Sequence, residues 1–118
     1  MKDINGEFEY KGKKYKLVFN LNVMEQIQDE FGSLDEWGKM TDGSKGEPNI
    51  KAVKFGFTAM INEAIEIENE ENGTDIKLVT NNFVGRMLTD IGLEEMASKM
   101  QETVVASTKN EEQEGKNE

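Results

Sequence analysis

The chain has 118 residues, and its 14 Lys and Arg against 24 Asp and Glu give a formal net charge of −10. This length predicts a single domain with one modest hydrophobic core. Apolar residues make up 36% of the chain and charged residues 32%, a balance that is typical of a polar but folded globular protein. No uncharged run is long enough to span a bilayer, and no basic segment followed by an apolar segment opens the chain. We therefore expect a cytoplasmic protein that does not bind a membrane.

The sequence contains no Cys and no His. This excludes disulfides and thiolate sites, and it removes both the usual general base near neutral pH and the commonest transition-metal ligand. Carboxylate chemistry and oxygen-ligand sites for Mg²⁺ or Ca²⁺ stay open. The net negative charge argues against unaided binding of nucleic acid, because the phosphate backbone would be repelled. We expect no enzyme activity, no catalytic residue and no cofactor.

Residues 6–19 predict a β-hairpin. Polar and apolar side chains alternate on either side of a turn that contains Gly12, and this period of two is typical of paired strands. Four lysines, together with Lys2 just before the segment, make it locally basic. They could meet an acidic partner, but lysine on the exposed face of a small sheet also discourages edge-to-edge pairing. The apolar positions of the alternation are Phe8, Tyr10, Tyr15, Leu17 and Phe19.

After Phe19 the apolar period changes to that of a helix. Asn22 followed by Glu25 has the form of a capping box, and Gly32 is a good left-handed stop. Ser33 followed by Glu36 repeats the capping pattern and predicts a second, short helix over residues 33–40. Residues 41–49 contain the only proline and two glycines, which predicts a loop.

A third helix is predicted from residue 49 or 50 to residue 69, and it carries apolar residues on two sides. At about 100° per residue, Val53, Phe57 and Ile61 share the main stripe, with Ile50, Met60 and Ala64 beside them. Ala52, Phe55 and Ala59 point the other way. A two-sided apolar helix is usually a central helix with neighbours on both sides. The alternative hypothesis is that Ala52, Phe55 and Ala59 form a partner-binding surface.

An acidic run follows, in which six carboxylates have no compensating base: Glu63, Glu66, Glu68, Glu70, Glu71 and Asp75. The run lacks the alternating Asp or Asn ligands, central Gly and final Glu of an EF-hand loop. We expect no metal site here, and we interpret the run as a solvated helix end.

The remaining sequence predicts two more helices. A turn at Asn72-Gly73 precedes an extended piece at residues 76–79, Thr80 caps a helix, and Gly92 separates it from the last one. We expect a globular domain over residues 1–108 and a disordered acidic tail over residues 109–118, since the tail has no apolar residue. The fold class is therefore α+β, a hairpin followed by four or five helices. The predicted core is Leu17, Phe19, Ile27, Phe31, Phe57, Ile61, Leu88, Leu93 and Met100.

The order of these elements resembles the tail assembly chaperones of long-tailed phages, prophages and gene-transfer-agent particles. The segment EFEYKGKKYKLVF followed by NLNVMEQIQDEFGSLDEW is similar to the opening hairpin and first helix of that family. Glu30, Phe31 and Gly32 match its acidic-aromatic-Gly helix end. The segment LVTNNFVGRMLTDIGLEEMASKM looks like the closing pair of helices, split at Gly92. The resemblance covers most of residues 6–107 and brings no catalytic signature.

The resemblance implies a role in assembly. Such chaperones bind the long helical tape measure protein, keep it soluble, help tail tube subunits polymerise around it, and leave before the tail is finished. In many phages a frameshift near the end of the reading frame adds a longer product. The resemblance therefore implies the tape measure protein and the tail tube protein as partners, with self-association as a further option. Two alternatives stay open: an acidic inhibitor that mimics DNA, and a structural component retained in the tail.

Overall fold

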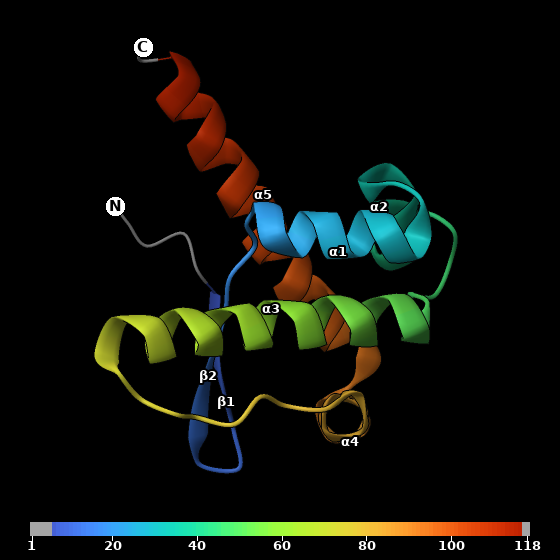
Figure 1. The fold of residues 1–118 in the computed structure, drawn as a ribbon. Coiled ribbons are helices and arrows are strands. Elements are labelled where there is room, and N and C mark those ends of the chain that lie inside the picture. Colours follow the sequence, from blue (N-terminus) through green and yellow to red (C-terminus); the bar gives the residue numbers. More distant parts are fainter. Residues whose placement is uncertain (1–5, 117–118) are drawn as a thin grey trace.

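The structure is a computed structural model that describes residues 6–116, with side chains described for residues 6–108. It has the expected α+β class, an N-terminal antiparallel hairpin followed by five helices (Figure 1). The elements are β1 (Gly6–Tyr10), β2 (Lys13–Leu17), α1 (Leu21–Phe31), α2 (Leu34–Thr41), α3 (Ile50–Asn72), α4 (Asn81–Ile91) and α5 (Leu93–Lys116).

The hairpin turns through Lys11 and Gly12, both at positive φ (52° and 81°). Two consecutive residues at positive φ are typical of the type I′ turn, whose twist matches that of the flanking strands. This turn fixes the register, in which Phe8 faces Tyr15 across the ladder. Their rings stack with centroids 5.6 Å apart. The prediction of a hairpin over residues 6–19 is thus confirmed, and Phe19 follows its second strand.

Each of the first four helices begins at a side chain that accepts a hydrogen bond from its first turn. Ser33 and Thr80 cap α2 and α4, as expected from the sequence, and Asn49 caps α3. The cap of α1 is Asn20, whose Oδ1 accepts from the backbone N–H of Val23, so the predicted cap at Asn22 is wrong. Both asparagines suit the position chemically, but the chain bends into the helix at Asn20, two residues earlier.

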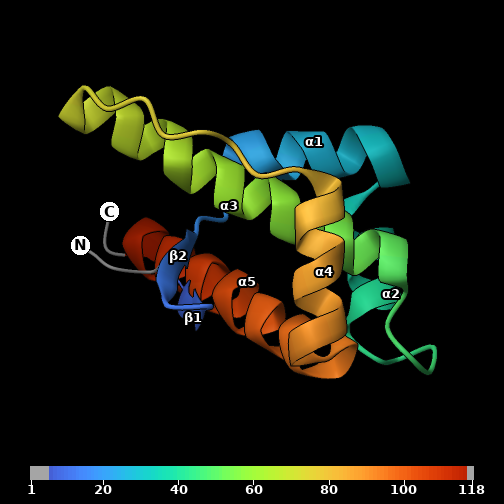
Figure 2. The same ribbon diagram turned by 90° about the horizontal axis from the view of Figure 1, so that it is seen from below.

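Helix α3 lies at the centre of the molecule (Figures 1 and 2). It contacts β2 and each of the other four helices, with α1 beside it and α5 crossing behind it in Figure 1. This arrangement gives α3 neighbours on both of its apolar sides. The interpretation of its two-sided pattern as that of a central helix is confirmed.

Seven of the nine predicted core residues are buried. The other two, Phe31 and Leu93, are half-buried because each stands at the end of a helix, where one side has no neighbour. Ile50 also departs from the expected inward stripe, because it is the first residue of α3 and is exposed. The buried members are Leu17, Phe19, Ile27, Phe57, Ile61, Leu88 and Met100.

Helix α5 continues to Lys116, past the boundary expected at residue 108. The side chains of residues 109–116 and the whole of residues 117–118 lie outside the described part of the chain. The disordered tail over residues 109–118 therefore stays a prediction. Within the described residues, none of the helices combines the length and the apolar character needed to cross a bilayer.

Candidate partner-binding surface

The predicted surface residue Ala52 is covered by a side chain of α2. The indole Nε1 of Trp37 donates a hydrogen bond to the backbone oxygen of Ala52 over 3.0 Å. One turn later, a Cβ at Gly56 would lie only 2.6 Å from Cζ2 of Trp37. The absence of side-chain bulk at these positions is therefore what lets the Trp37 ring lie against α3.

The structure corrects the predicted site at two of its three residues. Ala52 is fully buried and Ala59 is 6% exposed, so neither presents a free face to a second chain. The sequence rightly indicates that small residues admit a close neighbour here. It does not show whether the neighbour belongs to the same chain or to a partner. In the structure the neighbours are α1 and α2 of the same chain.

Phe55, the third predicted residue, is half-buried and stands at the edge of the α1–α3 contact. Its ring meets that of Phe31 edge to face, with centroids 5.4 Å apart. The Lys51 ammonium lies 5.9 Å from the centroid of the Phe31 ring and 3.1 Å from a carboxylate oxygen of Glu30. Phe55 thus holds α1 against α3 while part of its ring faces outward.

The outward part of Phe55 lines a hollow of about 240 Å³ whose floor is α3. Helix α1 contributes one wall, and the segment before α4 contributes the other. Leu78 stands on that second wall and is 47% exposed. The residues that line the hollow are Gln26, Phe55, Thr58, Ala59, Asn62, Glu63, Glu66, Leu78 and Asn81.

Glu63, at the base of this hollow, is buried, although the sequence pattern predicts a solvated carboxylate. Its Oε2 accepts hydrogen bonds from Nδ2 of Asn20 at 2.8 Å and from Nδ2 of Asn22 at 3.0 Å. A buried carboxylate is tolerated when it is hydrogen-bonded in this way. Glu63 therefore joins α3 to the start of α1, and it is not part of the solvated acidic run.

Residues 73–80 form an extended segment, here called the strap, that returns along α3 to the start of α4 (Figure 2). Two asparagines of α3 hold it. Asn62 accepts from the backbone N–H of Val79 at 2.8 Å and donates to its carbonyl at 3.0 Å. Asn69 bonds Ile76 in the same two ways, at 2.9 and 3.1 Å. The predicted extended piece at 76–79 is present, but it pairs with side chains of a helix and not with a strand.

Sequence reasoning did not find Leu78, Asn62 or Asn69 as members of this surface. A signal was present, because an Asn pair seven residues apart lies on one face of a helix. Leu78 stands in a segment where most side chains are polar. Neither feature shows by itself that the segment folds back onto α3.

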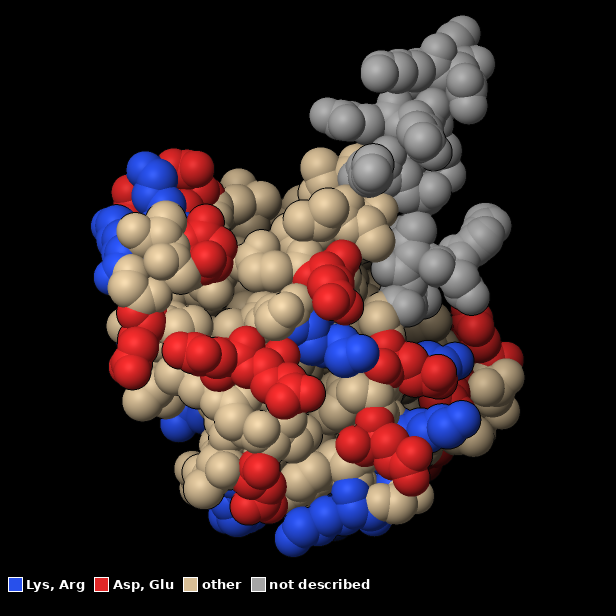
Figure 3. Space-filling view, turned by 180° about the vertical axis from the view of Figure 1, so that it is seen from behind, with Lys and Arg blue, Asp and Glu red and all other residues tan. Residues whose placement is uncertain are grey.

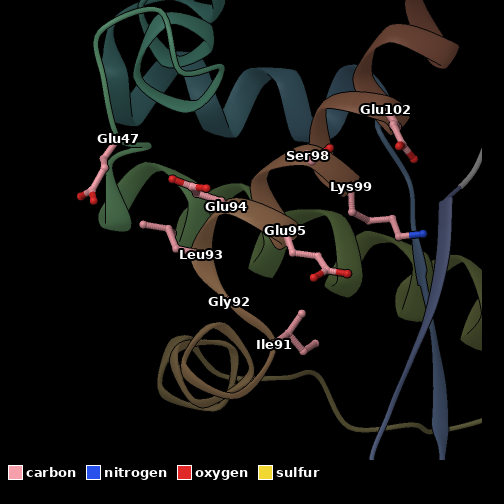
Figure 4. A pocket seen from close by; sticks show the side chains of 9 residues that line it. All are labelled: Glu47, Ile91, Gly92, Leu93, Glu94, Glu95, Ser98, Lys99 and Glu102. Atoms are coloured by element: carbon pink, nitrogen blue, oxygen red, sulfur yellow. The ribbon is translucent and has the colours of Figure 1, made fainter.

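Another hollow, of about 860 Å³, lies at the junction of α4 and α5 and is lined by Glu47, Ile91, Gly92, Leu93, Glu94, Glu95, Ser98, Lys99 and Glu102. Figure 4 shows that the charged side chains diverge, with Glu47 and Glu94 to one side and Glu95 and Lys99 to the other. They do not converge on one point. Among the described residues, no group of three or more acidic side chains is placed to hold a metal ion.

Comparisons of the chain with models of protein families, with curated proteins and with solved structures found no match. The function is therefore inferred from the residues and the fold. The surface they offer is a hollow along α3 to which Phe55 and Leu78 contribute apolar side chains among polar ones.

Proposed function

We propose that this chain is a non-catalytic tail assembly chaperone of a long-tailed phage or prophage. It binds the tape measure protein in the host cytoplasm, assists assembly of the tail tube, and is absent from the finished particle. The observation that carries the proposal is the order of the elements: a hairpin, two short helices, a long central helix, and a closing pair divided at Gly92. This is the order that the sequence shares with that family.

The described surface supports this proposal physically. A chaperone of a helical protein needs to bind apolar helix reversibly, which favours a shallow, partly apolar surface over a deep pocket. Phe55 and Leu78 present such a surface beside α3. Aromatic side chains at the centre of a contact contribute most of the binding energy in many interfaces. The net charge of −10 helps to keep a loaded complex in solution.

A DNA-mimicking inhibitor is the alternative of another class. Such a protein needs carboxylates in a continuous pattern over a rigid face. On the face in Figure 3, Lys and Arg side chains lie between the groups of Asp and Glu. This interspersed pattern favours the chaperone over the inhibitor.

The test is co-purification with the tape measure protein encoded beside this chain, followed by mass spectrometry of purified particles. We expect a complex before assembly and no copy of this chain in the finished particle. A chain retained in the particle would be a structural tail component. A chain that neither co-purifies nor is needed for tail formation would contradict the proposal.

A further inference from the structure

The strap is attached to α3 mainly through polar contacts at the surface. Of its residues only Ile76 and Val79 are even half-buried. The two asparagines hold it by four hydrogen bonds to the backbone of these two residues. Water can replace each of these bonds when the strap moves away, because the strap backbone lies at the surface. Separation of the strap therefore leaves no buried polar group without a partner.

The spacing of the contacts explains why the strap fits. Asn62 and Asn69 are seven residues apart, which is about 10.5 Å along a helix at 1.5 Å per residue. Ile76 and Val79 are three residues apart, which is about 10 Å in an extended chain. The two spacings match, so both asparagines can form their hydrogen bonds to the strap at the same time. The contact depends on these two side chains more than on the rest of the strap.

The strap separates two hollows on the surface of α3. On one side lies the hollow of Phe55 and Leu78. On the other lies a hollow of about 110 Å³ beside the hairpin, lined by Ile61, Ala64 and Ile65 of α3 together with Ile76 and neighbouring residues of β1 and β2. At about 100° per residue, the line from Asn62 to Asn69 runs between these two faces of the helix. Removal of the strap joins the two hollows into one groove along α3.

We propose that the strap opens while the rest of the domain stays folded, and that the groove uncovered in this way receives an amphipathic helix of the partner. The inference rests on the proposed function and identifies where the partner binds and what controls access. Each closed hollow is too small to take a helix, whose diameter with side chains is about 10 Å. The joined groove offers apolar residues from both hollows along the same helix.

The charges beside the groove define the chemistry of the occupant. Glu66 stands on the α1 side. The hairpin side has three lysines against two glutamates: Lys13, Lys14 and Lys16 against Glu7 and Glu68. A complementary helix has an apolar stripe, Lys or Arg on the flank toward Glu66, and Asp or Glu on the flank toward the hairpin. A second copy of this chain is an alternative occupant, and its binding would be seen as a change in oligomeric state.

Hydrogen exchange tests the opening. The amides of Ile76 and Val79 donate to the two asparagines and report directly on the strap. We expect them to be at least about 100-fold less protected than amides at the centre of α3, because local opening requires less free energy than global unfolding. Asn69→Ala should reduce their protection further, with the centre of α3 unchanged. Equal protection of the strap and the α3 centre in the native chain would overturn the proposal.

A crosslink tests the groove. The chain has no Cys, so Asn69→Cys combined with Ile76→Cys introduces one disulfide that ties the strap to α3. The same protein can be compared in its oxidised and reduced states. The probe is a helical peptide of about 20 residues with a Leu stripe, Lys on one flank and Glu on the other, and a peptide of scrambled order serves as control. We expect the oxidised state to bind the probe at least about tenfold more weakly than the reduced state.

Equal binding in both states, or no binding to either, would overturn the proposal. Co-purification with the tape measure protein is independent of these results. If the strap stays closed but the chain co-purifies with the tape measure protein, only the proposal of a groove under the strap is refuted. If the strap opens but the chain never co-purifies, only the proposed tail assembly function is refuted.

Discussion

Nδ2 of Asn20 donates a hydrogen bond to Oε2 of Glu63 over 2.8 Å, while Oδ1 of the same asparagine caps α1. The Asn20 side chain therefore caps α1 and also connects the start of α1 to the central helix α3. Asn22 adds a second donor to the same carboxylate oxygen. This partly buried polar junction fixes one wall of the hollow that Phe55 lines.

Glu63→Ala should destabilise the domain by about 1–3 kcal/mol, because it removes the acceptor of two hydrogen bonds, one of them from the half-buried Asn20. Glu63→Gln keeps an acceptor oxygen and should cost less. Glu66→Ala, on an exposed residue of the next turn, is the matched control and should change stability by no more than about 0.5 kcal/mol. Urea denaturation measures all three. An equal effect of the alanine variants at 63 and 66 would show that the junction contributes nothing.

Gly56→Ala should destabilise the domain by about 1–3 kcal/mol through overpacking. A Cβ at this position would lie 2.6 Å from Cζ2 of Trp37 and 2.8 Å from Sδ of Met100. Gly38→Ala is the opposite control, since a Cβ at Gly38 meets nothing within 4 Å in the interior of α2. It should stabilise the domain by about 1 kcal/mol. Thermal unfolding of the two variants should therefore shift in opposite directions, and a shared direction would contradict the packing described for Trp37.

Tyr10 should make stability fall in alkaline solution. Its hydroxyl donates to Oδ2 of Asp90 over 2.5 Å, and this hydrogen bond raises the pKa of Tyr10 above its usual 10.0. Because the folded state favours the protonated form of Tyr10, the stabilisation from this hydrogen bond is fully present below about pH 10. It is lost as the pH rises through the raised pKa. Tyr10→Phe should lose less stability than the native chain over this alkaline range, and identical pH profiles would show that the contact is not formed in solution.

Leu78→Asp should weaken binding of the tape measure protein by more than about tenfold, which corresponds to about 1.4 kcal/mol. Leu78 is 47% exposed, so the variant should keep its melting temperature. Leu21→Asp is a matched control at another exposed leucine, which does not line the hollow. Binding can be followed by titration calorimetry. Full affinity in the Leu78 variant would place the contact elsewhere on the molecule.

Local patterns were enough to predict most of the elements. The alternation around Gly12, the caps at Ser33 and Thr80, and the break at Gly92 each depend on residues close together in the chain. These signals need no knowledge of the tertiary fold. The hairpin, the five helices and seven of the nine core residues follow from them.

The candidate surface was harder to predict, because it depends on which elements meet. The periodicity of α3 shows two apolar sides but does not show that Trp37 covers Ala52, so a partner surface at Ala52 and Ala59 stayed open as the alternative hypothesis. Likewise, nothing local distinguishes Glu63, bonded to Asn20, from the exposed carboxylates that follow it. Of the three predicted surface residues, only Phe55 is partly exposed, because the helix beside it, α1, ends at Phe31.

The central claim is that this chain keeps a helical partner in solution. The most direct measurement is the soluble fraction of the neighbouring tape measure protein, expressed alone and together with this chain. We predict that most of the tape measure protein is insoluble alone and that co-expression brings it into solution as a complex. An unchanged soluble fraction, with both proteins well expressed, would contradict the claim.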